Sequence, residues 1–230
     1  MIDKIHVLTE KNVTWNVSVG NQAISLLQRK GLKGDEKEKV LNEACDILGN
    51  CGDPSKDENS ITGLAIGYVQ SGKTLSFTTV SALAVENGFN AVIIIAGSTT
   101  KLVDQTTKRL EGDLNIYTRS EVSWKLFKNP KKNQEDKIFG DMEVGLFNDK
   151  PALLITVMKN ISHLKHLNDL FDSKKIKSLD LKVLIIDDEA DQASLNTKAY
   201  TDIDNEVSAI YNSITNLRNK IKNHTYPEHL

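Results

Sequence analysis

Residues 64–77, LAIGYVQSGKTLSF, place a glycine-containing loop between two apolar runs. Gly67, Gly72, Lys73 and Thr74 match the spacing of a phosphate-binding loop, in which four residues separate the first glycine from Gly-Lys-Ser/Thr. Glycines let backbone N–H groups approach a phosphate closely, and the helix that follows points its positive end at the anion. We therefore predict that this loop binds phosphate, with Lys73 on the β- and γ-phosphates and Thr74 on Mg²⁺.

The segments around this loop alternate between two patterns. Short apolar runs predict strands that are buried on both faces, and they lie at 61–66, 90–97, 151–157 and 181–187. Amphipathic patterns predict helices between them, at 73–88, 99–110 and 159–172. This alternation predicts an α/β fold in which a parallel sheet lies between two layers of helices.

Three segments are expected along the chain: a helical N-terminal segment over 1–52, the α/β domain over 53–202, and an amphipathic C-terminal helix over 203–230. The charged and weakly patterned residues 119–150 are expected to form an exposed excursion from the domain. The C-terminal helix carries an apolar seam at spacings of three and four, which either packs on this domain or contacts a partner subunit; its residues are Val207, Ile210, Ile214, Leu217 and Ile221.

A cluster of acids follows the last predicted strand, in the sequence VLIIDDEADQASLNT at 183–197. Nucleotide hydrolysis on a phosphate loop needs a carboxylate for the metal and a second one for the attacking water. We predict Asp188 as the metal acid and Glu189 as the water-activating acid, which act with Lys73 in catalysis. Asp191 is expected to link this site to a neighbouring element.

The phosphate loop and the acids together resemble the first RecA-like domain of superfamily 2 helicases and translocases. That resemblance implies a three-layer P-loop ATPase domain that uses ATP and Mg²⁺. The segment IIIAGSTTKLVDQTTKRL resembles a motif in which the start of a helix contacts a nucleic-acid backbone, and the strand end LLITVMKN resembles the next such motif. The residues implied as nucleic-acid contacts are Thr99, Thr100, Lys101, Gln105, Lys159 and Asn160.

A narrower resemblance begins at Gln70 and Ser71, which precede Gly72 in VQSGKT and are implied to bind the nucleotide with it. Together with DDEADQASLNT, this string is similar to the Z-one domain family, a bacterial group associated with restriction and phage-defence proteins and with endonuclease components. The extension after the acids is the specific part of the match. Within it, Ser194 and Asn196 either orient the metal shell or cap the next helix.

These resemblances imply an ATPase that acts on nucleic acid, DNA in the first instance, in phage defence or restriction. Such proteins bind ATP between two RecA-like domains, and the second domain supplies an arginine to the transferring phosphoryl group. This sequence has no segment like that second domain, so we expect weak hydrolysis by the chain alone and an arginine from a second domain or a partner subunit. The alternative is a nucleotide-binding regulatory or interaction subunit with little turnover.

Composition sets limits on these expectations. With 29 basic and 31 acidic side chains the net charge is −2, so the chain as a whole has no basic signal for nucleic acid. Cys45 and Cys51 are too few for a disulfide framework, and the first residues do not resemble a signal peptide. We expect a cytoplasmic protein without a membrane partner. His163 and His166 lie three residues apart on a predicted helix, but the sequence offers no third metal ligand.

Overall fold

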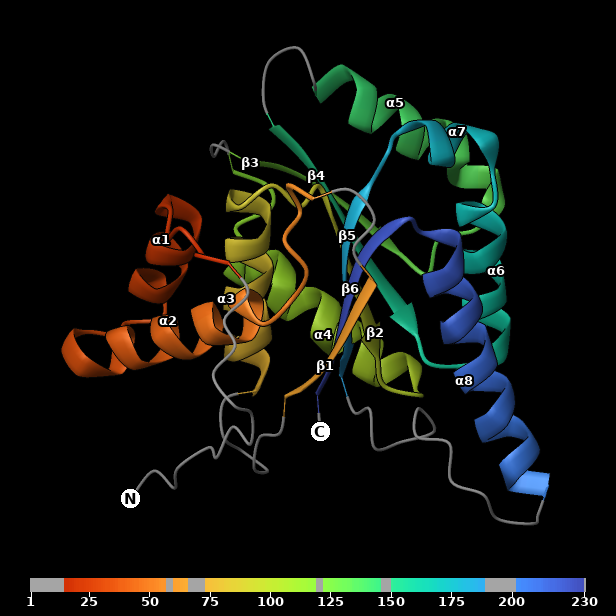
Figure 1. The fold of residues 1–230 in the computed structure, drawn as a ribbon, viewed down its shortest axis with the longest axis horizontal. Coiled ribbons are helices and arrows are strands. Elements are labelled where there is room, and N and C mark those ends of the chain that lie inside the picture. The colour runs from red at the N-terminus through yellow and green to blue at the C-terminus, as the bar shows by residue number, and fades with distance from the viewer. Residues whose placement is uncertain are drawn as a thin grey trace.

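The computed structural model describes residues 15–56, 60–65, 73–118, 122–145, 150–188 and 202–229. Within them, six strands form one sheet in the order β1-β6-β5-β2-β4-β3, and every neighbouring pair is parallel (Figure 1). The strands are β1 Ser60–Ala65, β2 Ala91–Ala96, β3 Val122–Lys128, β4 Lys150–Met158, β5 Lys182–Asp188 and β6 Asn223–His229.

Helices cover both faces of this sheet. One face carries α3 and α4, with α1 and α2 stacked outside α3; the other carries α5 to α8 (Figure 1). The first group comprises α1 Asn21–Arg29, α2 Gly34–Gly49, α3 Lys73–Glu86 and α4 Thr100–Asp113. The second comprises the short 3-10 turn η1 Lys132–Gln134 with α5 Glu135–Gly145, α6 Ile161–Phe171, α7 Lys174–Ser178 and α8 Asp202–Lys220. The predicted α/β fold with three layers is therefore confirmed.

The sequence of crossovers explains why the helices divide in this way. From β1 to β2 and on to β3 the chain moves in one direction along the sheet, and α3 and α4 lie on one face. From β3 back through β4 and β5 to β6 it moves in the opposite direction, and its helices lie on the other face. A fixed handedness of parallel crossovers requires this exchange of faces when the direction reverses.

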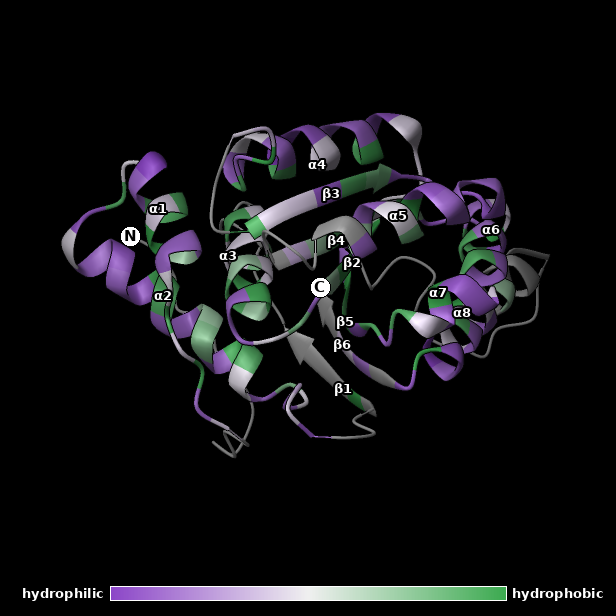
Figure 2. Cartoon of the chain, turned by 90° about the horizontal axis from the view of Figure 1, so that it is seen from above, coloured by the Kyte–Doolittle hydropathy of each residue, from purple (hydrophilic) through white to green (hydrophobic). Residues whose placement is uncertain are grey.

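The strand side chains alternate between two apolar clusters. Leu184 and Ile186 of β5 pack into the cluster under α3, whereas Val183 and Ile185 pack into the cluster under α6 and α8. This alternation follows from the two-residue period of a strand. Figure 2 shows apolar and polar residues side by side on the covering helices, as expected of helices with one buried face. No helix in the described part of the chain is long and apolar enough to cross a membrane.

The region from 119 to 150 differs from its prediction as an exposed excursion. It contains β3, which forms one edge of the sheet, and α5, which packs on the second face. Trp124 and Phe127 are both 5% exposed, on opposite faces of β3. Lys125 lies between them and Lys128 follows them, and these lysines gave the segment its exposed character in the sequence, as is typical of an edge strand.

The C-terminal region also differs from its prediction. The helix α8 ends at Lys220, and the prediction of a helix through residue 230 is wrong over 223–229, which form β6 inside the sheet. Ile210, Ile214 and Leu217 are buried against the second face, so this part of the seam packs on its own domain. The residues from 202 to 229 are therefore part of the α/β unit and not an appendage to it.

The N-terminal helices are attached through the end of α3. The first residue before α1 is Gly20, which has no side chain to cap that helix. Instead the Glu86 carboxylate accepts hydrogen bonds from the backbone N–H groups of Gly20 and Gln22, at 3.0 and 2.5 Å. Next to it, the Asn87 amide bonds both backbone groups of Ser18, at 2.8 Å each. A carboxylate at free helix N–H groups is favourable both as a cap and for the helix dipole.

We predict that Glu86→Ala destabilises the protein by about 1–2 kcal/mol, because the first N–H groups of α1 lose their acceptor. Urea unfolding followed by circular dichroism measures this loss. Glu43→Ala is the matched control, since Glu43 lies in a partly exposed ion pair with Lys39 within α2 at 3.8 Å. Equal effects of the two variants would show that Glu86 does not hold the N-terminal helices.

Candidate functional site at the carboxyl edge of the sheet

The described residues of the predicted nucleotide site lie at one edge of the sheet. Because all strands run in the same direction, their carboxyl ends lie at that edge. The register places Ala65 of β1 opposite His229 of β6, and His229 opposite Asp188 of β5. The sequence of the predicted phosphate loop begins after β1, whose last residue, Ala65, lies at the same register level as Asp188. Two strand spacings, about 9.5 Å, separate β1 from β5.

Asp188 lies on the face of the sheet that carries α3. Ile186, two residues earlier, belongs to the apolar cluster under that helix, and strand alternation assigns Asp188 to the same face. The side chain of Asp188 is partly exposed, as its position at the strand end requires. Helix α3 begins at Lys73, of which the structure describes the backbone, and its first turn contains Thr74. The structure thus places Asp188 and the start of α3 at the same edge and on the same face.

The Thr74 hydroxyl has a positively charged neighbour. Arg109 of α4 donates a hydrogen bond from Nη1 to Thr74 Oγ1 at 3.1 Å. Its guanidinium adds positive charge beside the N-terminus of α3, where the helix dipole already favours an anion. Nothing in the sequence signals this contact, because the two residues are 35 positions apart.

Asp187, the first acid of the cluster, has a different environment from Asp188. It points to the opposite face and is fully buried, with an exposed fraction of 0%. Lys159 Nζ lies 2.9 Å from Asp187 Oδ1, and the Tyr226 hydroxyl donates to Oδ2 at 2.7 Å. Each oxygen therefore has a partner on this face, so Asp187 is held as a buried anchor and not as a metal ligand.

This geometry corrects one predicted nucleic-acid contact. Lys159 is predicted as a nucleic-acid contact, but it is 2% exposed and its ammonium group pairs with Asp187. A charged side chain with a buried partner is not available to a phosphate backbone without breaking that pair. Asn160 next to it caps α6, where its side chain accepts from the His163 backbone N–H at 2.9 Å.

Four other residues predicted as nucleic-acid contacts lie at the start of α4. Thr99, Thr100, Lys101 and Gln105 are all exposed, in the first two turns of α4 or directly before it. Thr99 caps the helix by accepting from the Leu102 backbone N–H at 3.3 Å. Helix α4 follows β2 on one face of the sheet, and α8 follows the neighbouring strand β5 on the opposite face. Open parallel sheets bind their ligands where the connections of two neighbouring strands lie on opposite faces in this way.

The remaining predicted residues lie outside the described part of the chain. In the phosphate loop these are Gly67, Gln70, Ser71 and Gly72. After β5 they are Glu189, Asp191, Ser194 and Asn196. Both segments connect to strand ends that are described, and both strands end at the same edge.

Two described residues at this edge carry oxygen groups of the kind that bind Mg²⁺. Among the described residues, no three acidic, histidine or cysteine side chains gather as a metal cage. Mg²⁺ in nucleotide sites binds through one or two protein oxygens together with phosphate oxygens and water. Thr74 and Asp188 supply a hydroxyl and a carboxylate, which are ligands of the required type.

The histidine and cysteine pairs offer no second centre. The rings of His163 and His166 lie 6.3 Å apart on α6, and burial lowers the pKa of His163. In the described structure no third ligand approaches them. Burial raises the pKa of the Cys51 thiol to about 12, so it stays protonated at neutral pH.

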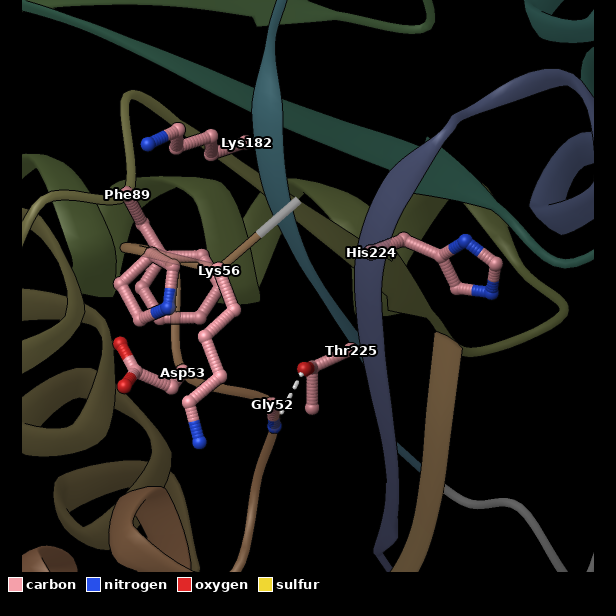
Figure 3. Close-up of a pocket in the computed structure, with 8 residues that line it drawn as sticks. Gly52, Asp53, Lys56, Phe89, Lys182, His224 and Thr225 are labelled. Atoms are coloured by element: carbon pink, nitrogen blue, oxygen red, sulfur yellow. Dashed lines mark hydrogen bonds between the residues drawn. The ribbon is translucent and has the colours of Figure 1, made fainter. Parts of the chain in front are cut away.

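A small hollow lies at the opposite, amino edge of the sheet. It is lined by residues before β1, before β2 and at the starts of β5 and β6, among them Phe89, Lys182 and Thr225. Figure 3 shows Lys56, Asp53 and Phe89 on one side of β6 and the His224 ring on the other. Its volume of about 10 Å³ holds roughly one water molecule. The hollow is therefore far too small for a nucleotide.

No protein-family model matches this chain, and no curated protein is significantly similar to it in sequence. The resemblances to superfamily 2 proteins and to the Z-one domain family therefore rest on the motif residues alone.

We predict opposite consequences for the two neighbouring acids. Asp187→Ala should cost about 3–5 kcal/mol in unfolding free energy, because it leaves the Lys159 ammonium buried without its partner. Asp188→Ala should change stability by less than about 1 kcal/mol, because Asp188 sits partly exposed at the strand end. Urea unfolding of the two variants measures both values. Similar losses for both acids would contradict the assignment of the buried pair.

Proposed function

We propose that this chain binds ATP with Mg²⁺ at the carboxyl edge of its sheet and hydrolyses it, as an ATPase that acts on nucleic acid. The observation that carries the proposal is the placement of Asp188. Asp188 lies at the same register level as the end of β1, which precedes the phosphate-loop sequence. It lies on the same face of the sheet as α3, which follows that sequence.

The proposed roles follow from the chemistry of each group. The N-terminus of α3 and the loop N–H groups bind the phosphates, and the Lys73 ammonium neutralises their charge. Thr74 and Asp188 hold Mg²⁺, which when bound neutralises charge that develops on the phosphoryl oxygens. Glu189, the next residue after Asp188, orients and deprotonates the attacking water. An arginine from a second RecA-like domain or from a partner subunit completes the site.

The proposed nucleic-acid surface is the exposed start of α4. Lys101 supplies positive charge there, and the hydroxyl of Thr100 and the amide of Gln105 supply hydrogen bonds. These groups suit contacts with a phosphate backbone, which position a protein without selecting a base sequence. On the basis of the motif resemblance we propose DNA as the nucleic acid and restriction or phage defence as the context.

We predict that Lys73→Ala weakens ATP binding by roughly 10–100-fold, the range expected for a lost charge-assisted contact. Glu189→Gln should leave ATP binding within about twofold and lower turnover by roughly 10²–10⁴-fold, as for loss of a general base. Binding of a fluorescent ATP analogue and phosphate release, each with and without Mg²⁺ and DNA, measure these effects.

Two outcomes of that experiment would contradict the proposal. Unchanged ATP affinity in Lys73→Ala would exclude the phosphate loop. Tight ATP binding by the wild type without turnover under any condition would exclude the ATPase and support the nucleotide-binding subunit. Lys108→Ala is the control variant, because Lys108 is an exposed lysine on α4 two turns beyond Lys101.

We further predict that Lys101→Ala weakens single-stranded DNA binding and reduces the dependence of log affinity on log salt by about 1, as for one lost phosphate contact. Lys108→Ala should leave both quantities unchanged. Fluorescence anisotropy over a series of salt concentrations measures the slopes. If the two variants behave alike, the start of α4 is not the nucleic-acid surface.

A further inference from the structure

The buried carboxylate of Asp187 joins three strands directly beside the proposed metal acid. Lys159 follows β4 and Tyr226 lies in β6, and both side chains reach Asp187 on β5. All three side chains are at most 2% exposed. The Lys159 backbone N–H also donates a hydrogen bond to Ala96 O of β2 at 3.1 Å, which fixes the backbone of this lysine to the sheet. The peptide that follows Asp187 leads straight into Asp188.

The bond from Tyr226 lies where the backbone ladder between β5 and β6 is interrupted. The register pairs Lys182–Leu184 with 223–225 and resumes at Asp187 opposite Glu228. Pro227 lies in the interval, and proline has no N–H group to donate to a ladder. The hydroxyl of Tyr226 therefore connects the two strands at the point where their backbones do not.

The other side of Tyr226 is fixed by the end of α8. The Arg218 guanidinium carbon lies 4.9 Å from the centroid of the Tyr226 ring, and Arg218 Nε donates to His224 Nε2 at 3.4 Å. His224 Nδ1 lies 2.9 Å from Ile221 O, so this nitrogen carries the proton and Nε2 is the acceptor. Burial, with Arg218 acting in the same direction, lowers the pKa of His224, which keeps the ring neutral. The ring of Tyr226 is thus held between α8 and Asp187.

We propose that Tyr226 is a positioning residue for the acid pair at the end of β5. Its hydroxyl and the Lys159 ammonium hold Asp187, and Asp187 in turn fixes the end of β5, which carries Asp188 and precedes Glu189 in the sequence. This inference rests on the proposed ATPase only for its effect on turnover; the effect on the strand itself is independent of it.

Two consequences follow from this arrangement. The Lys159 ammonium compensates the charge of Asp187, so the acids beside it do not experience a third uncompensated carboxylate. In addition, a displacement of β6 or of the end of α8 moves the Tyr226 hydroxyl and thereby the end of β5. A partner that binds α8 would then act on the proposed catalytic acids through one hydrogen bond.

The test uses Tyr226→Phe, which removes the hydroxyl and keeps the ring under Arg218. Tyr211→Phe is the matched control, because it removes a hydroxyl from the outer side of α8, where Tyr211 is 36% exposed. Hydrogen exchange of the ligand-free proteins should become roughly tenfold faster at the end of β5 in Tyr226→Phe, and stay unchanged in β2 and throughout Tyr211→Phe. The kcat for ATP should fall roughly tenfold in Tyr226→Phe, with ATP affinity within about twofold of the wild type.

Each result decides the proposal. Unchanged exchange at the end of β5 in Tyr226→Phe overturns it, whether or not the protein hydrolyses ATP. Faster exchange at the end of β5 in Tyr226→Phe, with unchanged kcat, overturns the proposal that Tyr226 positions the acids. If exchange becomes faster at this strand end while the wild type hydrolyses no ATP, the structural role is supported and the proposed ATPase fails.

Discussion

All six described strands run in the same direction, and the arrangement of the other elements follows from that constraint. A parallel sheet leaves no room for hairpins, so every connection must cross a face and bring a helix with it. Both faces are then covered, and the central strands can be apolar throughout, as Val92–Ile95 and Val183–Ile186 are. The same constraint gathers the carboxyl ends of the strands at one edge, where the proposed site lies.

The position of β6 shapes that edge more than any other strand. It separates β1 from β5, so the carboxyl ends of these two strands are about 9.5 Å apart. Within β6, Tyr226 bonds the buried Asp187. A buried ion pair is a costly way to stabilise a core, and apolar side chains often do as well. An ion pair to one carboxylate oxygen and a hydrogen bond to the other suit a positioning role.

Much of this fold could be predicted from the sequence, and the exceptions have physical reasons. The strands at 90–97 and 181–187 were visible because both of their faces are apolar. Strand β3 was not, because this edge strand carries Lys125 between its buried residues and Lys128 at its end. Strand β6 was not, because Pro227 and its polar neighbours do not resemble a central strand. Helix α8 lies directly before it, and the apolar seam gave no sign of where the helix stops.

The site likewise contains some residues that could be predicted from the sequence and others that could not. Asp188 and the start of α3 were predictable, since their motif and its order along the chain carry the information. The partners of Asp187 were not, because Lys159 and Tyr226 lie 28 and 39 positions away and no local pattern links them. The contact of Glu86 with the start of α1 was hidden for the same reason. Contacts of this kind are fixed by the packing of whole elements.

The most direct test of this account is a crystal structure of the chain with Mg²⁺ and a non-hydrolysable ATP analogue. The account predicts the triphosphate at the N-terminus of α3 and a metal ion about 2.1 Å from an oxygen of Thr74, with Asp188 as the acid on its other side, directly or through water. Asp187 should remain bound to Lys159 and Tyr226. A nucleotide bound elsewhere, or a metal held by Asp187 in place of Asp188, would contradict it.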